Sequence, residues 1–195
     1  MKSQNSSLVS IILASFAFPM CVMAGPSDFH VDTDLANSKH YQQIIDDNSR
    51  IISADPKNAR AHDLRGMAYR RLGQYEKAVA DYTRAIELNA NDSEAYTGRG
   101  LARCGGLPGS AGQPEIDDWT TAIGLDRKST AAYVYCGIAY QMMRNREKAT
   151  VDYKMAIKLD PTSELGKCAV WNLRTLDRLN QPPPKSVTSE NVGYK

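Results

Sequence analysis

Side chains able to perform acid–base, nucleophilic or metal chemistry are few in this sequence, and their spacing does not suit such chemistry. The histidines are His30, His40 and His62. None of them stands at a metal-ligand or nucleophile spacing from a cysteine or an acidic pair. The neighbouring carboxylates Asp46-Asp47 and Asp117-Asp118 would diverge by about 100° on a helix, so they cannot share a proton unaided. We therefore predict no catalytic residue, no metal site and no cofactor.

The sequence also gives no support for phosphate, nucleic-acid or anionic-membrane binding. The glycine-rich stretch from Gly105 to Gly112 has no following Lys-Ser or Lys-Thr, so it does not match a phosphate-binding loop. Lysine and arginine total 24 against 22 acidic residues, and the two signs are interspersed. That pattern is typical of solvated helix faces and gives no electrostatic reason to expect nucleic acid or an anionic membrane as a partner.

The first 24 residues differ from the rest of the chain. Lys2 supplies positive charge, residues 8–18 are mostly apolar, and small Ala24 precedes Gly25. This is the layout of a secretory signal peptide. The apolar run is short for a membrane-spanning helix of about 20 residues, although an uncleaved anchor is the alternative if the run is counted through Ala24. We predict export to the periplasm or the medium, with membrane attachment only if residues 1–24 are retained.

The chain repeats itself with a period of 34 residues. Gly66, Gly100 and Gly137 occupy the same place in three copies, and the extra residues before the third copy fit the stretch 105–112. In each copy the apolar residues recur at three- and four-residue spacing, which predicts two amphipathic helices. Glycine inside a helix costs roughly 1 kcal/mol relative to alanine, so its recurrence indicates that two helices approach closely there.

This pattern resembles the tetratricopeptide repeat. In the third copy the family signature reads Cys136-Gly137, Tyr140, Ala149, Tyr153 and Pro161. With its amino-terminal segment, the chain resembles an exported bacterial member of the family. The resemblance implies an all-α fold, a right-handed superhelical array of antiparallel helix pairs that ends in a C-terminal capping helix.

The array is expected to span residues 25–180. Its parts are a half-repeat at 39–56, repeats at 59–92, 93–129 and 130–162, and a capping helix at 163–180. A capping helix is expected because the last repeat would otherwise leave an apolar face in water. Residues 181–195 are polar and proline-containing, so we predict a flexible tail there.

Charged residues also recur in register. Asp81, Asp118 and Asp152 share one place in the second helices, and Arg65 and Arg99 share one place in the first. The favoured interpretation is a structural ion pair between the helices of a repeat, and the alternative is contact with a charged ligand. Cys136 stands where the third copy would have its arginine, so such a pair is not required in every repeat.

The resemblance implies that the first helices line a concave groove that receives a peptide or helix of a partner protein. The residues expected to line it are Asp63, Met67, Arg70, Thr97, Leu101, Val134, Ile138 and Gln141. Met67, Leu101 and Ile138 form an apolar middle row, which is expected to face solvent in the free protein. The alternative is that the chain's own amino-terminal segment or a second copy covers this row.

The resemblance therefore implies a non-catalytic interaction scaffold or adaptor of the cell envelope. Its partner is a protein or peptide, and the alternative is a self-associating envelope scaffold. Some family members clamp a terminal carboxylate with lysines and asparagines in this groove, and those residues are absent here.

The cysteines left after signal cleavage are Cys104, Cys136 and Cys168. Cys136 and Cys168 fall at similar heights on helices expected to be neighbours, which makes them the candidate disulfide. Packed helix axes are about 8–10 Å apart, whereas a bridge needs Cα atoms within about 7 Å, so three small core thiols remain the alternative.

Export gives the first testable prediction. If residues 1–24 are a cleaved signal, the processed protein begins at Gly25 or within a few residues of it. Amino-terminal sequencing of the protein from its native host checks this. Recovery of the full-length chain alone, in the membrane pellet, would replace the signal peptide with an anchor.

Overall fold

The chain forms a row of antiparallel helices in a computed structural model that describes residues 35–178. The helices are α2 (Leu35–Ala54), α3 (Ala59–Arg71), α4 (Tyr75–Leu88), α5 (Ser93–Arg103), α6 (Gln113–Leu125), α7 (Thr130–Met142), α8 (Arg146–Leu159) and α9 (Glu164–Arg178), with a short 3₁₀ helix, η1 (Pro108–Ser110), before α6. The described residues contain no β-strand. The predicted all-α array with a C-terminal capping helix is confirmed.

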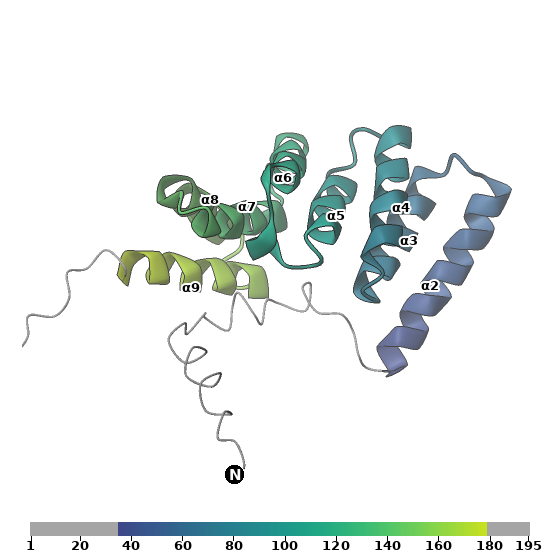
Figure 1. Cartoon of the computed structure of the whole chain (residues 1–195), viewed down its shortest axis with the longest axis horizontal. Coiled ribbons are helices and arrows are strands. Elements are labelled where there is room, and N and C mark those ends of the chain that lie inside the picture. The colour runs from purple at the N-terminus through teal and green to yellow at the C-terminus, as the bar shows by residue number, and fades with distance from the viewer. Residues whose placement is uncertain (1–34, 179–195) are drawn as a thin grey trace, which may run out of the picture.

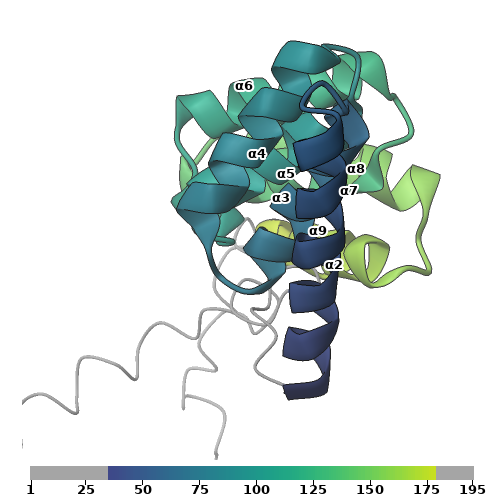
Figure 2. The same ribbon diagram turned by 90° about the vertical axis from the view of Figure 1, so that its right-hand side faces the viewer.

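Successive helices lie beside one another from α2 at one end to α9 at the other (Figure 1). Viewed from the α2 end, the helices overlap one behind the next (Figure 2). The pairs α3/α4, α5/α6 and α7/α8 are the three repeats, and α2 is the second helix of the half-repeat. It begins at Leu35, earlier than the half-repeat expected from residue 39.

Side-chain caps explain where the first helices begin. Asn58 accepts a hydrogen bond from the Ala61 amide, Asp92 from the Glu94 and Ala95 amides, and Ser129 from the Ala132 amide. Each cap satisfies an amide that has no partner within the helix itself. The same position therefore starts the first helix in all three repeats.

The glycine of each first helix lies against an aromatic ring of the second helix. A Cβ atom built on Gly100 would lie 2.6 Å from the Trp119 indole nitrogen, and one built on Gly137 would lie 2.6 Å from the Tyr153 ring. Trp119 and Tyr153 are fully buried, so neither ring has room to move. The close packing expected from the repeated glycines is confirmed.

Part of the expected groove is covered. Leu101 and Ile138 were expected to face solvent and Val134 to line the groove, but all three are buried and belong to one core cluster. Both η1 and α9, which lie outside the repeat pattern, contact α7, the helix that carries Val134 and Ile138. The expectation of an exposed row through Leu101 and Ile138 was wrong.

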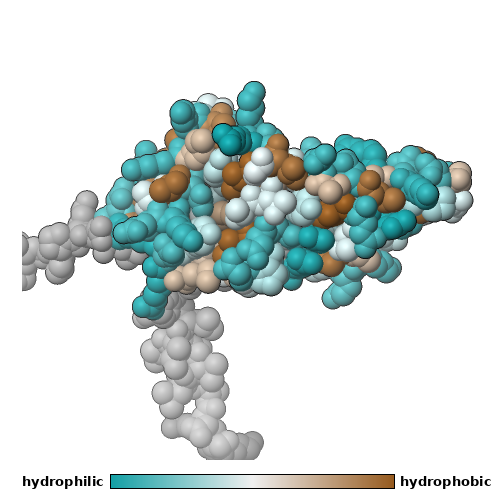
Figure 3. Space-filling view, turned by 90° about the horizontal axis from the view of Figure 1, so that it is seen from above, coloured by the Kyte–Doolittle hydropathy of each residue, from teal (hydrophilic) through white to brown (hydrophobic). Residues whose placement is uncertain are grey.

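Several expectations fall outside the described residues. These are the signal peptide at 1–24, the beginning of the array at 25–34 and the tail at 181–195. In residues 35–178, none of the helices has both the length and the apolar character needed to cross a bilayer. The surface in Figure 3 shows hydrophobic side chains in scattered patches between hydrophilic ones.

The glycine contacts predict opposite effects for two alanine substitutions. Gly137→Ala should lower the free energy of unfolding by about 1–3 kcal/mol, because its methyl group would overlap the Tyr153 ring. Gly124→Ala is the matched control: nothing lies within 4 Å of its added Cβ, so alanine should raise stability by up to about 1 kcal/mol. Urea denaturation followed by circular dichroism measures both. Equal stabilisation by the two changes would contradict the packing described here.

The burial of Leu101 predicts that Leu101→Glu destabilises the fold by about 3 kcal/mol or more, because an unpaired carboxylate would enter the core. Leu107→Glu is the control, since Leu107 is 52% exposed. Thermal melts should separate the two variants clearly. Unchanged melting of Leu101→Glu would show that Leu101 faces solvent after all.

Candidate functional site

The contact between glycine and ring sets the register of the charged residues. Arg65 and Arg99 directly precede the glycines of their first helices, and Asp81 and Asp118 directly precede the rings of the second helices. Because the glycine of the first helix is held against the ring of the second, the arginine and the aspartate that precede them are brought together in each helix pair. The structure confirms the ion pair that the sequence predicts.

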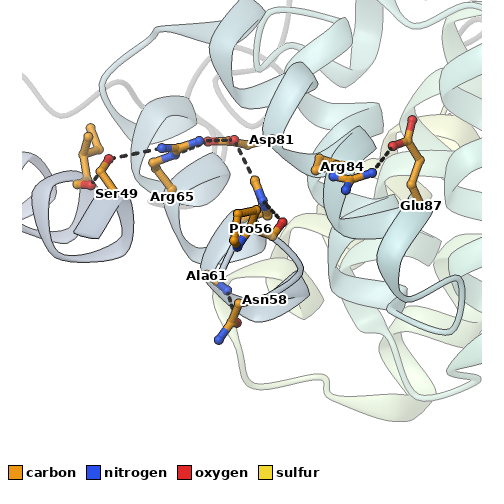
Figure 4. Close-up of polar contacts among 10 residues, drawn as sticks. Ser49, Pro56, Asn58, Ala61, Arg65, Asp81, Arg84 and Glu87 are labelled. Atoms are coloured by element: carbon orange, nitrogen blue, oxygen red, sulfur yellow. Dashed lines mark hydrogen bonds and ion pairs between the residues drawn. The ribbon is translucent and has the colours of Figure 1, made fainter. Parts of the chain in front are cut away.

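Both ion pairs are bidentate and largely shielded from solvent. Arg65 donates to Asp81 from Nε at 2.7 Å and from Nη2 at 2.8 Å, and its Nη1 donates to Ser49 Oγ of α2 at 3.2 Å (Figure 4). In the next repeat, Arg99 donates to Asp118 from Nε at 3.0 Å and from Nη2 at 2.6 Å. Two parallel bonds to one carboxylate make these strong, directional contacts. They tie the first helix to the second within each repeat.

His62 is part of the same network. Its Nδ1 lies 3.3 Å from Asp81 Oδ1, its Nε2 lies 3.3 Å from the Pro56 carbonyl oxygen, and the side chain is buried. This placement gives His62 a packing role within its repeat. The residues within 35–178 include no cluster of three or more His, Cys, Asp or Glu side chains able to hold a metal ion.

A pocket of about 530 Å³ lies along the first helices and is called here the first-helix pocket. Its walls come mainly from α3, α5 and the start of α7. Among its lining residues are Arg60, Asp63, Met67, Thr97, Leu101 and Tyr135. Apolar side chains, hydroxyl groups and charged side chains all line it, a mixed composition that suits a binding cleft.

Opposite charges join two first helices at this pocket. Arg60 donates to Asp63 Oδ2 at 2.7 Å and to Glu94 Oε2, on the neighbouring first helix, at 3.0 Å. Burial, with Asp92 nearby, outweighs Arg60 and raises the pKa of Asp63 to about 6. Because folding raises this pKa, the protonated carboxyl group favours the folded state. This contribution to the free energy of unfolding is fully present at low pH and is lost as the pH rises through about 6.

The sequence identified part of this pocket. Of the eight residues expected to line the groove, five do line it: Asp63, Met67, Arg70, Thr97 and Leu101. Val134 and Ile138 are instead covered in the core, and Gln141 accepts a hydrogen bond from the Tyr153 hydroxyl at 2.7 Å.

Arg60, Glu94 and Tyr135 also line the pocket but were not anticipated. A usable signal existed for the first two, because Arg60 and Glu94 are one 34-residue period apart and of opposite charge.

The candidate disulfide is not formed. Cys136 and Cys168 are both thiols, and their side chains lie in different surroundings. Cys136 borders a hollow between α6 and α8, whereas the Cys168 sulfur accepts a hydrogen bond from Asn172 of its own helix at 3.3 Å. Burial raises the pKa of Cys136 to about 12, which keeps the thiol protonated and unreactive.

Comparison with known proteins agrees with this architecture. The model of the TPR repeat family, where TPR stands for tetratricopeptide repeat, matches residues 66–103. The pea (Pisum sativum) protein "Translocon at the outer membrane of chloroplasts 64" is 32% identical over 128 residues, which is 66% of this chain and 21% of the relative. This chain therefore spans about a fifth of that relative's length.

Two solved structures share the fold. The TPR domain of Arabidopsis OM64 is 29% identical, with a TM-score of 0.54 over 60% of this chain and 94% of that domain. The first TPR domain of Spaghetti (RPAP3), bound to the HSP90 peptide SRMEEVD, is 24% identical, with a TM-score of 0.55 over 64% of this chain and 94% of that chain. Together with the repeated glycine, ring and helix-pair geometry, these matches show that residues 35–178 have the fold of tetratricopeptide-repeat domains and that residues 66–103 match the repeat itself.

Proposed function

We propose that this chain is a non-catalytic interaction module that binds an extended peptide of a partner protein in the first-helix pocket. The observation that carries the proposal is the pocket itself, a cleft of about 530 Å³ shared by three successive first helices. A cleft that crosses several repeats suits a ligand longer than one side chain. A peptide laid across α3, α5 and α7 would contact all three.

The lining favours apolar and hydrogen-bonding contacts. Leu64, Met67 and Tyr135 offer apolar surface, while Ser93 and Thr97 offer hydroxyl groups. A peptide with an apolar side chain facing Met67 and main-chain groups near the hydroxyls would satisfy both. Such mixed contacts are the usual basis of peptide recognition in a groove.

A peptide that ends in an acidic carboxylate cluster fits less well. The Spaghetti domain was solved with the acidic peptide SRMEEVD. In the present chain the lining, which lies wholly within residues 35–178, includes no lysine and no asparagine. Its arginines are Arg60, which is paired with Asp63 and Glu94, and Arg70, and the lining also carries three carboxylates, Asp63, Glu94 and Asp126. The proposed ligand is therefore a neutral or basic peptide that binds through its interior rather than through its terminal carboxylate.

We further propose that the module acts outside the cytoplasm, in the cell envelope or the medium. The support is the amino-terminal sequence, with Lys2 before an apolar run and Ala24 before Gly25.

The groove proposal is tested with peptides selected by phage display against residues 25–195 and measured by fluorescence polarisation. Met67→Glu should weaken the selected peptides at least about tenfold, which needs only ~1.4 kcal/mol. Met67 is partly exposed, so the fold should melt at nearly the wild-type temperature. A synthetic SRMEEVD peptide should show no saturable binding up to about 1 mM.

Ile51→Glu on α2 is the matched control, because Ile51 is an exposed aliphatic residue away from the pocket. If the selected peptides bind the Met67→Glu variant normally but do not bind the Ile51→Glu variant, the binding site does not lie on the first helices. Light scattering separates the self-association alternative: a concentration-dependent dimer abolished by Met67→Glu would mean that a second copy is the occupant.

A further inference from the structure

Two repeats hold a guanidinium group beside an aspartate of the second helix and a tyrosine of the first. Arg65 and Arg99 each lie between two second helices, bonded to an aspartate of the later one. Each also lies near a tyrosine of its own helix, with the guanidinium carbon of Arg65 6.0 Å from the Tyr69 ring centre and that of Arg99 5.4 Å from the Tyr96 ring centre. Carboxylate and aromatic ring together form a favourable environment for guanidinium.

The third repeat has the corresponding aspartate and tyrosines, with a cysteine in place of the arginine. Cys136 lies 16 residues before Asp152, just as Arg65 lies 16 residues before Asp81. A hollow of about 470 Å³, called here the third-repeat pocket, opens between α6, α7 and α8. Its lining includes Thr120, Tyr133, Cys136, Tyr140, Val151 and Asp152. The short cysteine side chain leaves open the volume that an arginine fills in the other two repeats.

Each receptor group of the earlier repeats has a counterpart here. Tyr140 corresponds to Tyr69, and Tyr133 corresponds to Tyr96. Thr120 lies 16 residues before Cys136, as Ser49, which accepts a bond from Arg65, lies 16 residues before that arginine. The third-repeat pocket therefore brings together a carboxylate, two tyrosines and the Thr120 hydroxyl group, which is hydrogen-bonded to the Cys136 thiol.

The Asp152 carboxylate is not satisfied by the described chain. Within residues 35–178 it forms neither a hydrogen bond nor a salt bridge. Burial raises its pKa to about 6, and the opposing charge is Lys148. Lys148 itself lies over the Tyr140 ring, with Nζ 4.9 Å from the ring centre, and Glu147 also lines the pocket. A cation bound in the pocket would directly offset the cost of burying the negative charge of this carboxylate.

We propose that the third-repeat pocket receives an arginine side chain of a partner protein, bound in a bidentate fashion by Asp152 and flanked by Tyr133 and Tyr140. Guanidinium is favoured over ammonium because its planar fork matches a carboxylate at two points, as Arg65 and Arg99 do. Residues 1–34 and 179–195 contain no arginine, so the chain's own undescribed segments cannot supply one. This site lies on a different face of α7 from the first-helix pocket, which Tyr135 lines.

The test is an NMR titration of ¹⁵N-labelled protein, residues 25–195, with N-acetyl-arginine methylamide, and with N-acetyl-lysine methylamide as the comparison. The arginine probe should shift amide signals around Tyr140 and Asp152 saturably and bind more tightly than the lysine probe. Asp152→Asn should weaken it at least about tenfold, because the charged acceptor is lost. Asp117→Asn, on the exposed side of α6, is the control and should leave binding unchanged.

Cys136→Arg supplies a second arm. Its own guanidinium should occupy the pocket and abolish binding of the free probe, and if this variant does not fold, Asp152→Asn alone decides. Arginine binding that is equally strong in wild type and Asp152→Asn would overturn the proposal. So would equal binding of the lysine probe, or the absence of saturable shifts.

Discussion

Each helix pair of this array is fixed at one point, where an aromatic ring of the second helix lies against a glycine of the first. Trp119 and Tyr153 occupy the space that a side chain would need at Gly100 and Gly137, and Tyr82 lies 3.3 Å from where a Cβ atom on Gly66 would stand. A ring in that position sets both the distance between the helices and their relative register. The residue before the glycine must then face the residue before the ring, which is why the arginine–aspartate pairs form. The helices that line both pockets therefore keep this distance and register.

The ion pairs follow from this constraint and have their own energetic consequence. Asp81 and Asp118 are buried, and removing a partner from a buried carboxylate typically costs about 3–5 kcal/mol. The third repeat has replaced the arginine with cysteine and kept the aspartate. Asp152 is less deeply buried than its counterparts, so water reaches it and the repeat still folds. The arrangement retains a receptor for a cation without supplying the cation.

Local, repeated features could be predicted from the sequence. The glycines and the arginine–aspartate pairs recur at a fixed period, and each depends only on two helices of one repeat. The burial of Val134 and Ile138 could not be predicted in this way, because it depends on η1 and on α9, which are not part of the repeat pattern. The sequence does contain a signal for the third-repeat pocket: Cys136 stands at the position of the arginine, while the aspartate, Asp152, is present. The sequence alone showed only that the pair is dispensable, since the shape of the vacated volume requires the packed helices.

The central claim is that one guanidinium receptor is built in all three repeats and filled by the chain itself in two. A double-mutant cycle on unfolding free energy between Cys136→Arg and Asp152→Asn tests it most directly. The account predicts that Cys136→Arg stabilises the wild-type background, that the gain disappears with Asp152→Asn, and that the coupling energy is about 1–3 kcal/mol. An effect of Cys136→Arg that is the same in both backgrounds, with a coupling energy near zero, would contradict it.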